Sequence, residues 1–136
     1  MTHGSPLLHI ITQVALPAAP SAGQCALLSA GTGLAVGVTG LVVLALVGSG
    51  ETMLRGDHRD VLQRAVEFLK ESQNEKTGLI GSAKGHTVLY NHGIATVAVA
   101  QVYGLHRSPI LKSVVQKAVG VIERARNPYS GWRYGL

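Results

Sequence analysis

The amino-acid sequence predicts an all-α protein built from two copies of an α/α hairpin. Two stretches, 57–73 and 108–127, carry apolar residues at the spacing of one helix face. Two others, 31–50 and 91–103, are apolar and rich in small residues. The chain also matches itself when it is shifted by 53 residues, which indicates an internal repeat. Each copy should therefore contain an apolar inner helix and an amphipathic outer helix that covers it.

Length and composition favour one helical domain and exclude several kinds of site. The 136 residues suffice for one buried core, and charged residues make up only 14% of them. All twelve Lys and Arg lie at or after Glu51, dispersed among the seven acidic residues, so we expect no nucleic-acid binding despite the net charge of +5. The single Cys25 leaves no internal disulfide and no multi-cysteine zinc site. We expect no metal and no cofactor.

The N-terminal part of the chain allows two interpretations. Residues 1–30 are a lead-in of undetermined structure, because they contain several prolines and show no periodicity. Residues 31–50 are uncharged and long enough to span a membrane. They are also explained as a buried repeat helix, because they align with 91–103, which contains Gln101 and is too short to span. The location, cytoplasmic or membrane-associated, stays open.

The repeats occupy about 39–78 and 92–131 of a domain that we place at 31–136. Eight of the forty aligned positions are identical, and they include helix positions and turn glycines. The identical pairs are Gly40/Gly93, Ala45/Ala98, Val61/Val114, Gln63/Gln116, Ala65/Ala118, Val66/Val119, Asn74/Asn127 and Gly78/Gly131. The repeat thus reads as inner helix, loop, outer helix and Gly-containing turn.

Residues that favour helix ends place the two outer helices. Asp57 can cap the first, which should end near Gln73. Ser108 and Pro109 form a typical start for the second, and Pro128 should stop it. A further group of glycines in 31–40 suits close packing between helices, because no Gly-Lys-Ser or Gly-Lys-Thr follows that would complete a phosphate loop.

Several strings resemble bacterial prenyltransferase/squalene-oxidase repeat proteins, which are related to squalene-hopene cyclases. In the second repeat these are Tyr90-Asn91-His92-Gly93-Ile94-Ala95-Thr96, Gln116-Lys117-Ala118 and residues 126–134; in the first they are residues 39–45 and 48–52. The resemblance covers about 33–136. It implies an (α/α) toroid of the terpenoid-cyclase and protein-prenyltransferase kind, of which two hairpins are an incomplete ring.

The signatures of that superfamily are incomplete in this chain. Its cyclase repeats carry a Gln before a Gly and a Trp, whereas here Gln73 precedes Gly78 without the Trp, and Trp132 follows Gly131 without the Gln. We interpret both strings as structural turns. The Asp-x-Asp-Asp acid cluster of the cyclases is absent, and Cys25 has no matched Asp for the zinc site of the prenyltransferases. Catalytic residues are therefore unknown, and whether the chain is an enzyme stays open.

Two groups of residues are candidates for ligand binding. The start of an inner helix faces the mouth of a toroid, which singles out Tyr90, Asn91 and His92; a ring nitrogen of His92 could instead bond a loop carbonyl. A second group, which could stack on a ligand or pack within its own turn, is Trp132, Arg133 and Tyr134.

Three functions are compatible with these patterns. The first is a non-catalytic helical repeat module that binds an apolar or isoprenoid ligand or a protein partner, with self-association through exposed apolar edges. The second is a part of a terpenoid cyclase or prenyltransferase-like enzyme whose catalytic residues lie on missing repeats. The third is a membrane-anchored protein held by 31–50.

Overall fold

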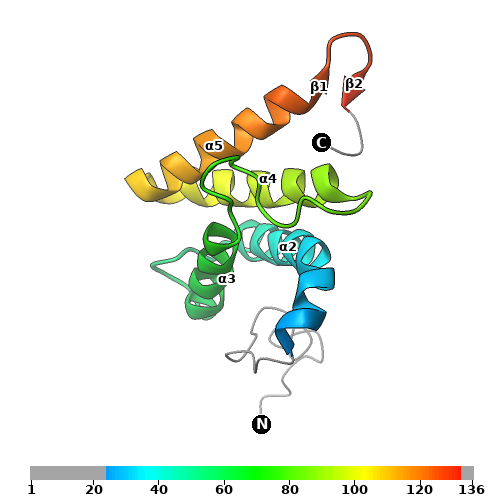
Figure 1. Ribbon diagram of the computed structural model, residues 1–136. Helices are drawn as coiled ribbons and strands as arrows, with labels where there is room; N and C mark the ends of the chain where they lie inside the picture. The colour runs from blue at the N-terminus through cyan, green and yellow to red at the C-terminus, as the bar shows by residue number, and fades with distance from the viewer. Residues whose placement is uncertain (1–23, 133–136) are drawn as a thin grey trace.

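The computed structural model describes residues 24–132, with side chains from residue 33 onward. Four helices make up most of this part of the chain (Figure 1): α2 (Gln24–Gly48), α3 (Arg59–Glu71), α4 (Val88–His106) and α5 (Pro109–Ala125). A two-residue-per-strand hairpin follows α5, formed by β1 (Arg126–Asn127) and β2 (Gly131–Trp132). The predicted all-α class is confirmed for this part of the chain.

Two inner helices are longer than the sequence patterns indicated. Helix α2 begins at Gln24, inside the segment 1–30 whose structure the sequence left undetermined. Helix α4 extends the expected 91–103 at both ends, and Arg107 stops it in a left-handed conformation (φ 51°) with its N–H bonded to the Tyr103 carbonyl. Within the described residues, no helix is both long enough and apolar enough to span a membrane.

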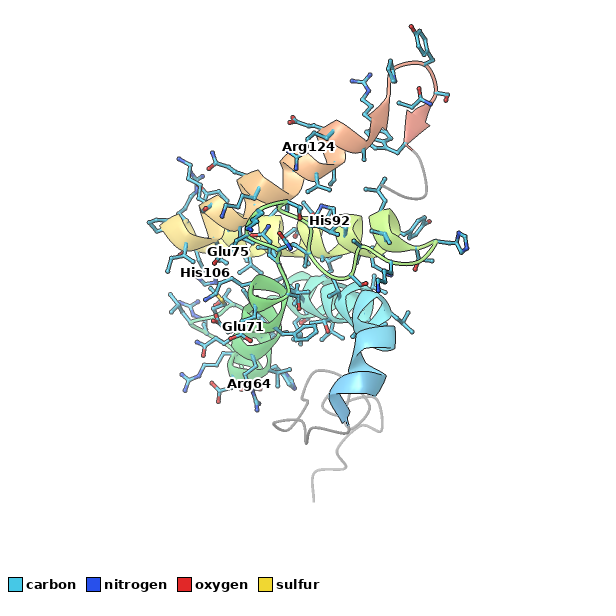
Figure 2. The ribbon with its side chains drawn as sticks, viewed as in Figure 1. Arg64, Glu71, Glu75, His92, His106 and Arg124 are labelled. Carbon is cyan, nitrogen blue, oxygen red and sulfur yellow. The ribbon has the colours of Figure 1, made fainter. Side chains whose placement is uncertain are left out.

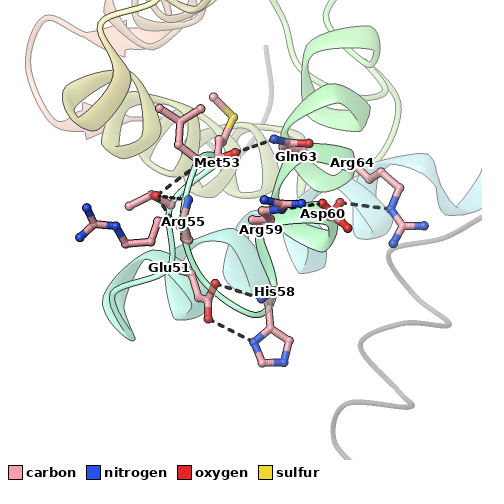
Figure 3. Close-up of polar contacts among 10 residues, drawn as sticks. Glu51, Met53, Arg55, His58, Arg59, Asp60, Gln63 and Arg64 are labelled. Atoms are coloured by element: carbon pink, nitrogen blue, oxygen red, sulfur yellow. Dashed lines mark hydrogen bonds and ion pairs between the residues drawn. The ribbon is translucent and has the colours of Figure 1, made fainter.

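His58, and not Asp57, is the N-cap residue of α3, and the carboxylate of Glu51 bonds to it (Figure 3). The Oε2 of Glu51 accepts a hydrogen bond from the backbone N–H of His58 at 3.0 Å, and its Oε1 lies 3.2 Å from His58 Nδ1. The bond from the His58 N–H lowers the pKa of the Glu51 carboxyl, because it stabilises the charged form. The expected Asp57 cap is therefore wrong: His58 is the N-cap residue, and its own N–H bonds to a carboxylate from seven residues earlier, which lies near the positive end of the helix dipole.

Helices α2 and α4 pack closely and run in the same direction (Figure 1). Gly37 lies against Asn91, and Gly40 lies against Ile94 and Ala95, so later residues of one helix meet later residues of the other. A Cβ on Gly40 would lie 3.0 Å from Ile94 Cγ2 and 3.2 Å from the Ala95 backbone. The expected role of glycines in close helix packing is thus confirmed at these two positions.

The outer helices complete the core on either side of this pair. Helix α5 packs on α4 and α3 packs mainly on α2, so that α4 lies between α2 and α5 (Figure 1). As expected from the sequence, each outer helix buries its apolar face and exposes the opposite face. Their fully buried members include Leu62, Leu69 and Ala118.

Candidate functional site on helices α2 and α4

His92 of α4 lies between the loop after α3 and helix α5 (Figure 2). Its side chain is fully buried. The backbone N–H of Ile80 donates to its Nδ1 at 3.0 Å, and its Nε2 lies 3.0 Å from the carbonyl oxygen of Ala118. One ring therefore joins α4 to the loop after α3 and to the middle of α5.

These two bonds define the protonation state of His92. A backbone N–H can donate only to an unprotonated ring nitrogen, so Nδ1 is the acceptor and Nε2 carries the proton that it donates to Ala118. Burial lowers the pKa of His92, because it penalises the charged imidazolium. Both ring nitrogens are occupied by the backbone, so the ring fastens three segments together and offers no free nitrogen to a ligand.

The other two candidates at the start of α4 differ in exposure. Asn91 is almost fully buried against Gly37, and its Nδ2 donates to Thr87 Oγ1 at 3.1 Å. Tyr90, in contrast, is 69% exposed. Of the three neighbouring residues, only Tyr90 is available to a partner.

Trp132 lies on the β1–β2 hairpin, apart from the start of α4. Its indole is 58% exposed, and its Nε1–H donates to the Ile122 carbonyl at 3.0 Å, within the same hairpin and helix. Arg133 and Tyr134 lie outside the described residues. Within the described part of the chain, no hydrogen bond joins Trp132 to Tyr90, Asn91 or His92.

Gln73 ties the turn after α3 to α5. Its Nε2 donates to the carbonyl of Gly78 at 3.0 Å, across its own turn, and to that of Val114 at 2.9 Å. Arg124 of α5 makes a second link to the same turn, because its guanidinium donates a hydrogen bond to the Thr77 carbonyl at 2.7 Å. The side chain of Gln73 is thus a structural link, in agreement with the interpretation of this string as a turn.

Exposed apolar residues and half-buried small or apolar residues form one stripe on each inner helix. We define the α2 flank as Leu34, Val38, Leu41 and Ala45, and the α4 flank as Tyr90, Gly93, Val97 and Ala100. In each stripe the members are three or four residues apart, so they share one side of their helix. Leu41 is 54% and Val97 is 50% exposed. Neither inner helix, α2 (Gln24–Gly48) or α4 (Val88–His106), contains an Asp, Glu, Lys or Arg.

Two open grooves lie elsewhere on the described surface. One, of about 380 Å³, is lined mainly by α3 and the start of α5 and includes Met53, Val66 and Ile110. The other, of about 390 Å³, is polar and lies beside the turn after α3, where Lys117 and Arg124 face it. Both are surface depressions lined by different outer-helix residues, and neither includes Tyr90 or His92.

Some features of the site carry no clear signal in the sequence. In the part of the chain that the structure describes, the hydroxyl of Thr39 is buried without a hydrogen-bond partner, and Thr39 lies 53 residues before His92. The Nε2 of His106 accepts a hydrogen bond from the backbone N–H of Met53 at 3.1 Å. In the sequence, only the 53-residue separation between Met53 and His106 could have indicated that these two residues are in contact. Among the described residues, no group of three or more His, Cys, Asp or Glu is placed to hold a metal ion.

No protein-family model, curated protein or solved structure matches this chain.

Proposed function

We propose that the chain is a non-catalytic α/α repeat module that binds another protein through the α2 and α4 flanks. It would be two hairpins of a toroid of the prenyltransferase and squalene-cyclase-like kind. The observation that carries the proposal is the offset of the contacts between α2 and α4. Gly37 meets Asn91, which is 54 residues later, and Gly40 meets Ile94 and Ala95, which are 54 and 55 residues later. These separations are close to the 53-residue repeat of the sequence.

Such offsets are what a repeat array requires. When each unit packs beside a copy of itself, a residue lies near its own equivalent in the next unit. The bond from the Met53 N–H to His106 joins two positions that are 53 residues apart. Both observations support a regular displacement from one hairpin to the next.

The turns after the two outer helices provide independent support. After α3, Gln73 pairs with Ile80 in an isolated antiparallel bridge. After α5, Arg126 pairs with Trp132 and Asn127 with Gly131. Since Gln73 and Arg126 are equivalent in the repeat, both units end in a tight reversal that begins at the same position.

Binding of a protein is favoured over binding of a small apolar molecule by the shape of the exposed surface. Leu34 and Leu41 on one helix, and Tyr90 and Val97 on the other, lie along the helices as stripes. A stripe with helical spacing matches the face of another helix, whereas a small ligand needs a concave pocket that encloses it. Exposed apolar stripes of this kind are typical of interaction surfaces.

Site-specific photo-crosslinking tests the proposed surface. The full chain would carry a photoreactive amino acid at position 41 or 97, on the two flanks, or at position 110 as the matched control. Ile110 is also apolar and 63% exposed, but it lies on α5. We expect protein adducts at 41 and 97 and far weaker ones at 110. Adducts at 110 alone, or none at 41 and 97, would contradict the proposal.

A further inference from the structure

The α4 flank has an open position where the equivalent position of α2 is filled. Gly40 and Gly93 are equivalent in the repeat. A Cβ on Gly40 would touch Ile94 and Ala95, whereas a Cβ on Gly93 would meet no atom of the described residues within 4 Å. Val97, the equivalent of the half-buried Leu44, is likewise exposed. The surface of α2 that receives α4 therefore recurs on α4, where it receives nothing within the described chain.

The turn after α5 has an open position of the same kind. Gly78 and Gly131 are equivalent, and both have a positive φ, of 84° and 80°. Gly78 lies tightly beneath the backbone of Lys117, whereas a Cβ on Gly131 would have no described atom within 4 Å. Leu79 is buried, but Trp132, at the equivalent position, is exposed. Two separate elements, α4 and the β1–β2 hairpin, thus lack the same neighbour.

Helices α2 and α3 carry the equivalents of the residues that cover Gly40 and Gly78. Leu41 is equivalent to Ile94, and Ala45 to Ala98, which lie on the face of α4 that packs on α2. On the outer layer, Arg64 of α3 is equivalent to Lys117, whose carbonyl covers Gly78. Leu41, Ala45 and Arg64 are all exposed.

We infer that the partner of these flanks is a second copy of this chain, docked head to tail. The α2 flank of one copy lies along the α4 flank of the next, in the same direction, and continues the packing of α2 on α4. Leu41 of one copy then covers Gly93 of the other, while Arg64 approaches Gly131. This inference rests on the proposed function, because it uses the same two flanks and the same repeat.

The chemistry of the flanks fits a copy of the chain. Both flanks are uncharged in a chain with a net charge of +5, so no like charges oppose each other where α2 of one copy lies along α4 of the next. The equivalence breaks at one end, where Tyr90 stands at the position of Gly37. At that end the helices of two copies lie farther apart than α2 and α4 do within one chain. The exposed Tyr90 ring of one copy contacts Val38 of the other, which is equivalent to the polar Asn91. Because the two surfaces differ, the contact is heterologous and builds a ring or an open chain of copies.

Light scattering coupled to size exclusion, on the full chain at increasing concentration, measures this assembly. Leu41→Glu disables only the α2 flank and Val97→Glu only the α4 flank. Each should weaken self-association more than about tenfold, because an unpaired charge would be buried in the contact. Ile110→Glu, on α5, is the control and should assemble like the unchanged chain. Circular dichroism checks that each variant is folded, and Leu41→Gln with Val97→Thr replaces any Glu variant that is not.

Mixing the two variants tests the head-to-tail geometry. The Leu41→Glu chain keeps its α4 flank and the Val97→Glu chain keeps its α2 flank, so the mixture should form a one-to-one heterodimer and nothing larger. The inference is overturned if the unchanged chain stays monomeric, if either variant assembles normally, or if the mixture stays monomeric. Monomeric chain that still crosslinks other proteins at 41 and 97 would reject the self-partner and leave the proposed function standing.

Discussion

Nε2 of His92 lies 3.0 Å from the carbonyl oxygen of Ala118, and this bond fastens the middle of α5 to the start of α4. The other ring nitrogen holds Ile80, so the same side chain also places the turn that follows α3. Three segments that are distant in the sequence therefore depend on one neutral imidazole. Their stability must respond to its protonation.

We expect the free energy of unfolding to decrease as the pH falls below about 6.5. Protonation of His92 removes the acceptor that binds the Ile80 N–H and places a charge in the core. Because the pKa of His92 is lowered in the folded protein from its ordinary value of 6.5, the unfolded chain binds the proton more readily. The stabilisation is complete above the unfolded pKa and is lost as pH falls from there towards the lower folded pKa. Urea unfolding followed by circular dichroism at several pH values measures it.

Two substitutions assign this pH dependence. His92→Gln cannot titrate, so the slope of stability between pH 7.5 and 5.5, a span set to about one unit on either side of the ordinary histidine pKa, should become much smaller. His86→Gln, which removes a histidine from an exposed loop, is the matched control. His92→Ala should also cost about 2–4 kcal/mol at neutral pH, since it strands a buried N–H and a buried carbonyl. An unchanged slope in His92→Gln would assign the effect to another group.

The outer helices were predictable because one strong signal determines them. Residues such as Leu62, Ala65 and Leu69 recur at helical spacing, and in the structure they form the buried face of α3. The ends of the inner helices were not predictable, because uncharged residues such as Leu105 favour a helix without marking where it ends. The bond at the start of α3 from the His58 N–H was missed because its acceptor, Glu51, lies seven residues earlier, outside the local window in which capping is recognised.

Packing of the inner helices leads to a second prediction, at Gly40 and Gly93. Gly40→Ala should destabilise the fold by about 1–2 kcal/mol, because the new methyl group meets the Ala95 backbone, which cannot rotate away. Gly93→Ala meets open space and should stabilise α4 by up to about 1 kcal/mol through higher helix propensity. Denaturant midpoints of the two variants, measured on dilute protein in which copies are separate, give the difference. Equal effects at both positions would refute the close α2–α4 contact.

The candidate site shows why single residues were harder to interpret than patterns. Tyr90, Asn91 and His92 are consecutive, yet one is exposed, one packs on a glycine and one is fully buried. Helical geometry separates neighbours by about 100°, so consecutive residues do not share a face. Which of them faces the core depends on where the other helices lie, and the local sequence does not contain that information.

Gln73 leads to a third prediction, because it donates from one amide to two carbonyls. Gln73→Glu keeps the shape but replaces the donor with a carboxylate oxygen beside the carbonyls of Gly78 and Val114. We expect a loss of about 2–4 kcal/mol at neutral pH, with partial recovery in acid, where the protonated carboxyl donates one bond. Gln116→Glu, at an exposed position of α5, is the matched control and should change little. Thermal unfolding of both variants at neutral and acidic pH measures the loss of stability and its partial recovery in acid.

The fourth prediction compares the two turn glycines, which share a backbone conformation and differ in their surroundings. An alanine at either Gly78 or Gly131 must adopt a positive φ, at a cost of about 1–2 kcal/mol. At Gly78 the methyl group would also overlap the Lys117 carbonyl, so Gly78→Ala should lose more than Gly131→Ala, by about 1–3 kcal/mol. Urea unfolding of dilute protein measures both. In the assembly assay the order is different: in the proposed assembly a second copy covers Gly131, so Gly131→Ala should weaken association, although it destabilises the isolated chain less than Gly78→Ala does. A Gly131→Ala chain that assembles with unchanged affinity would place the contact between copies elsewhere.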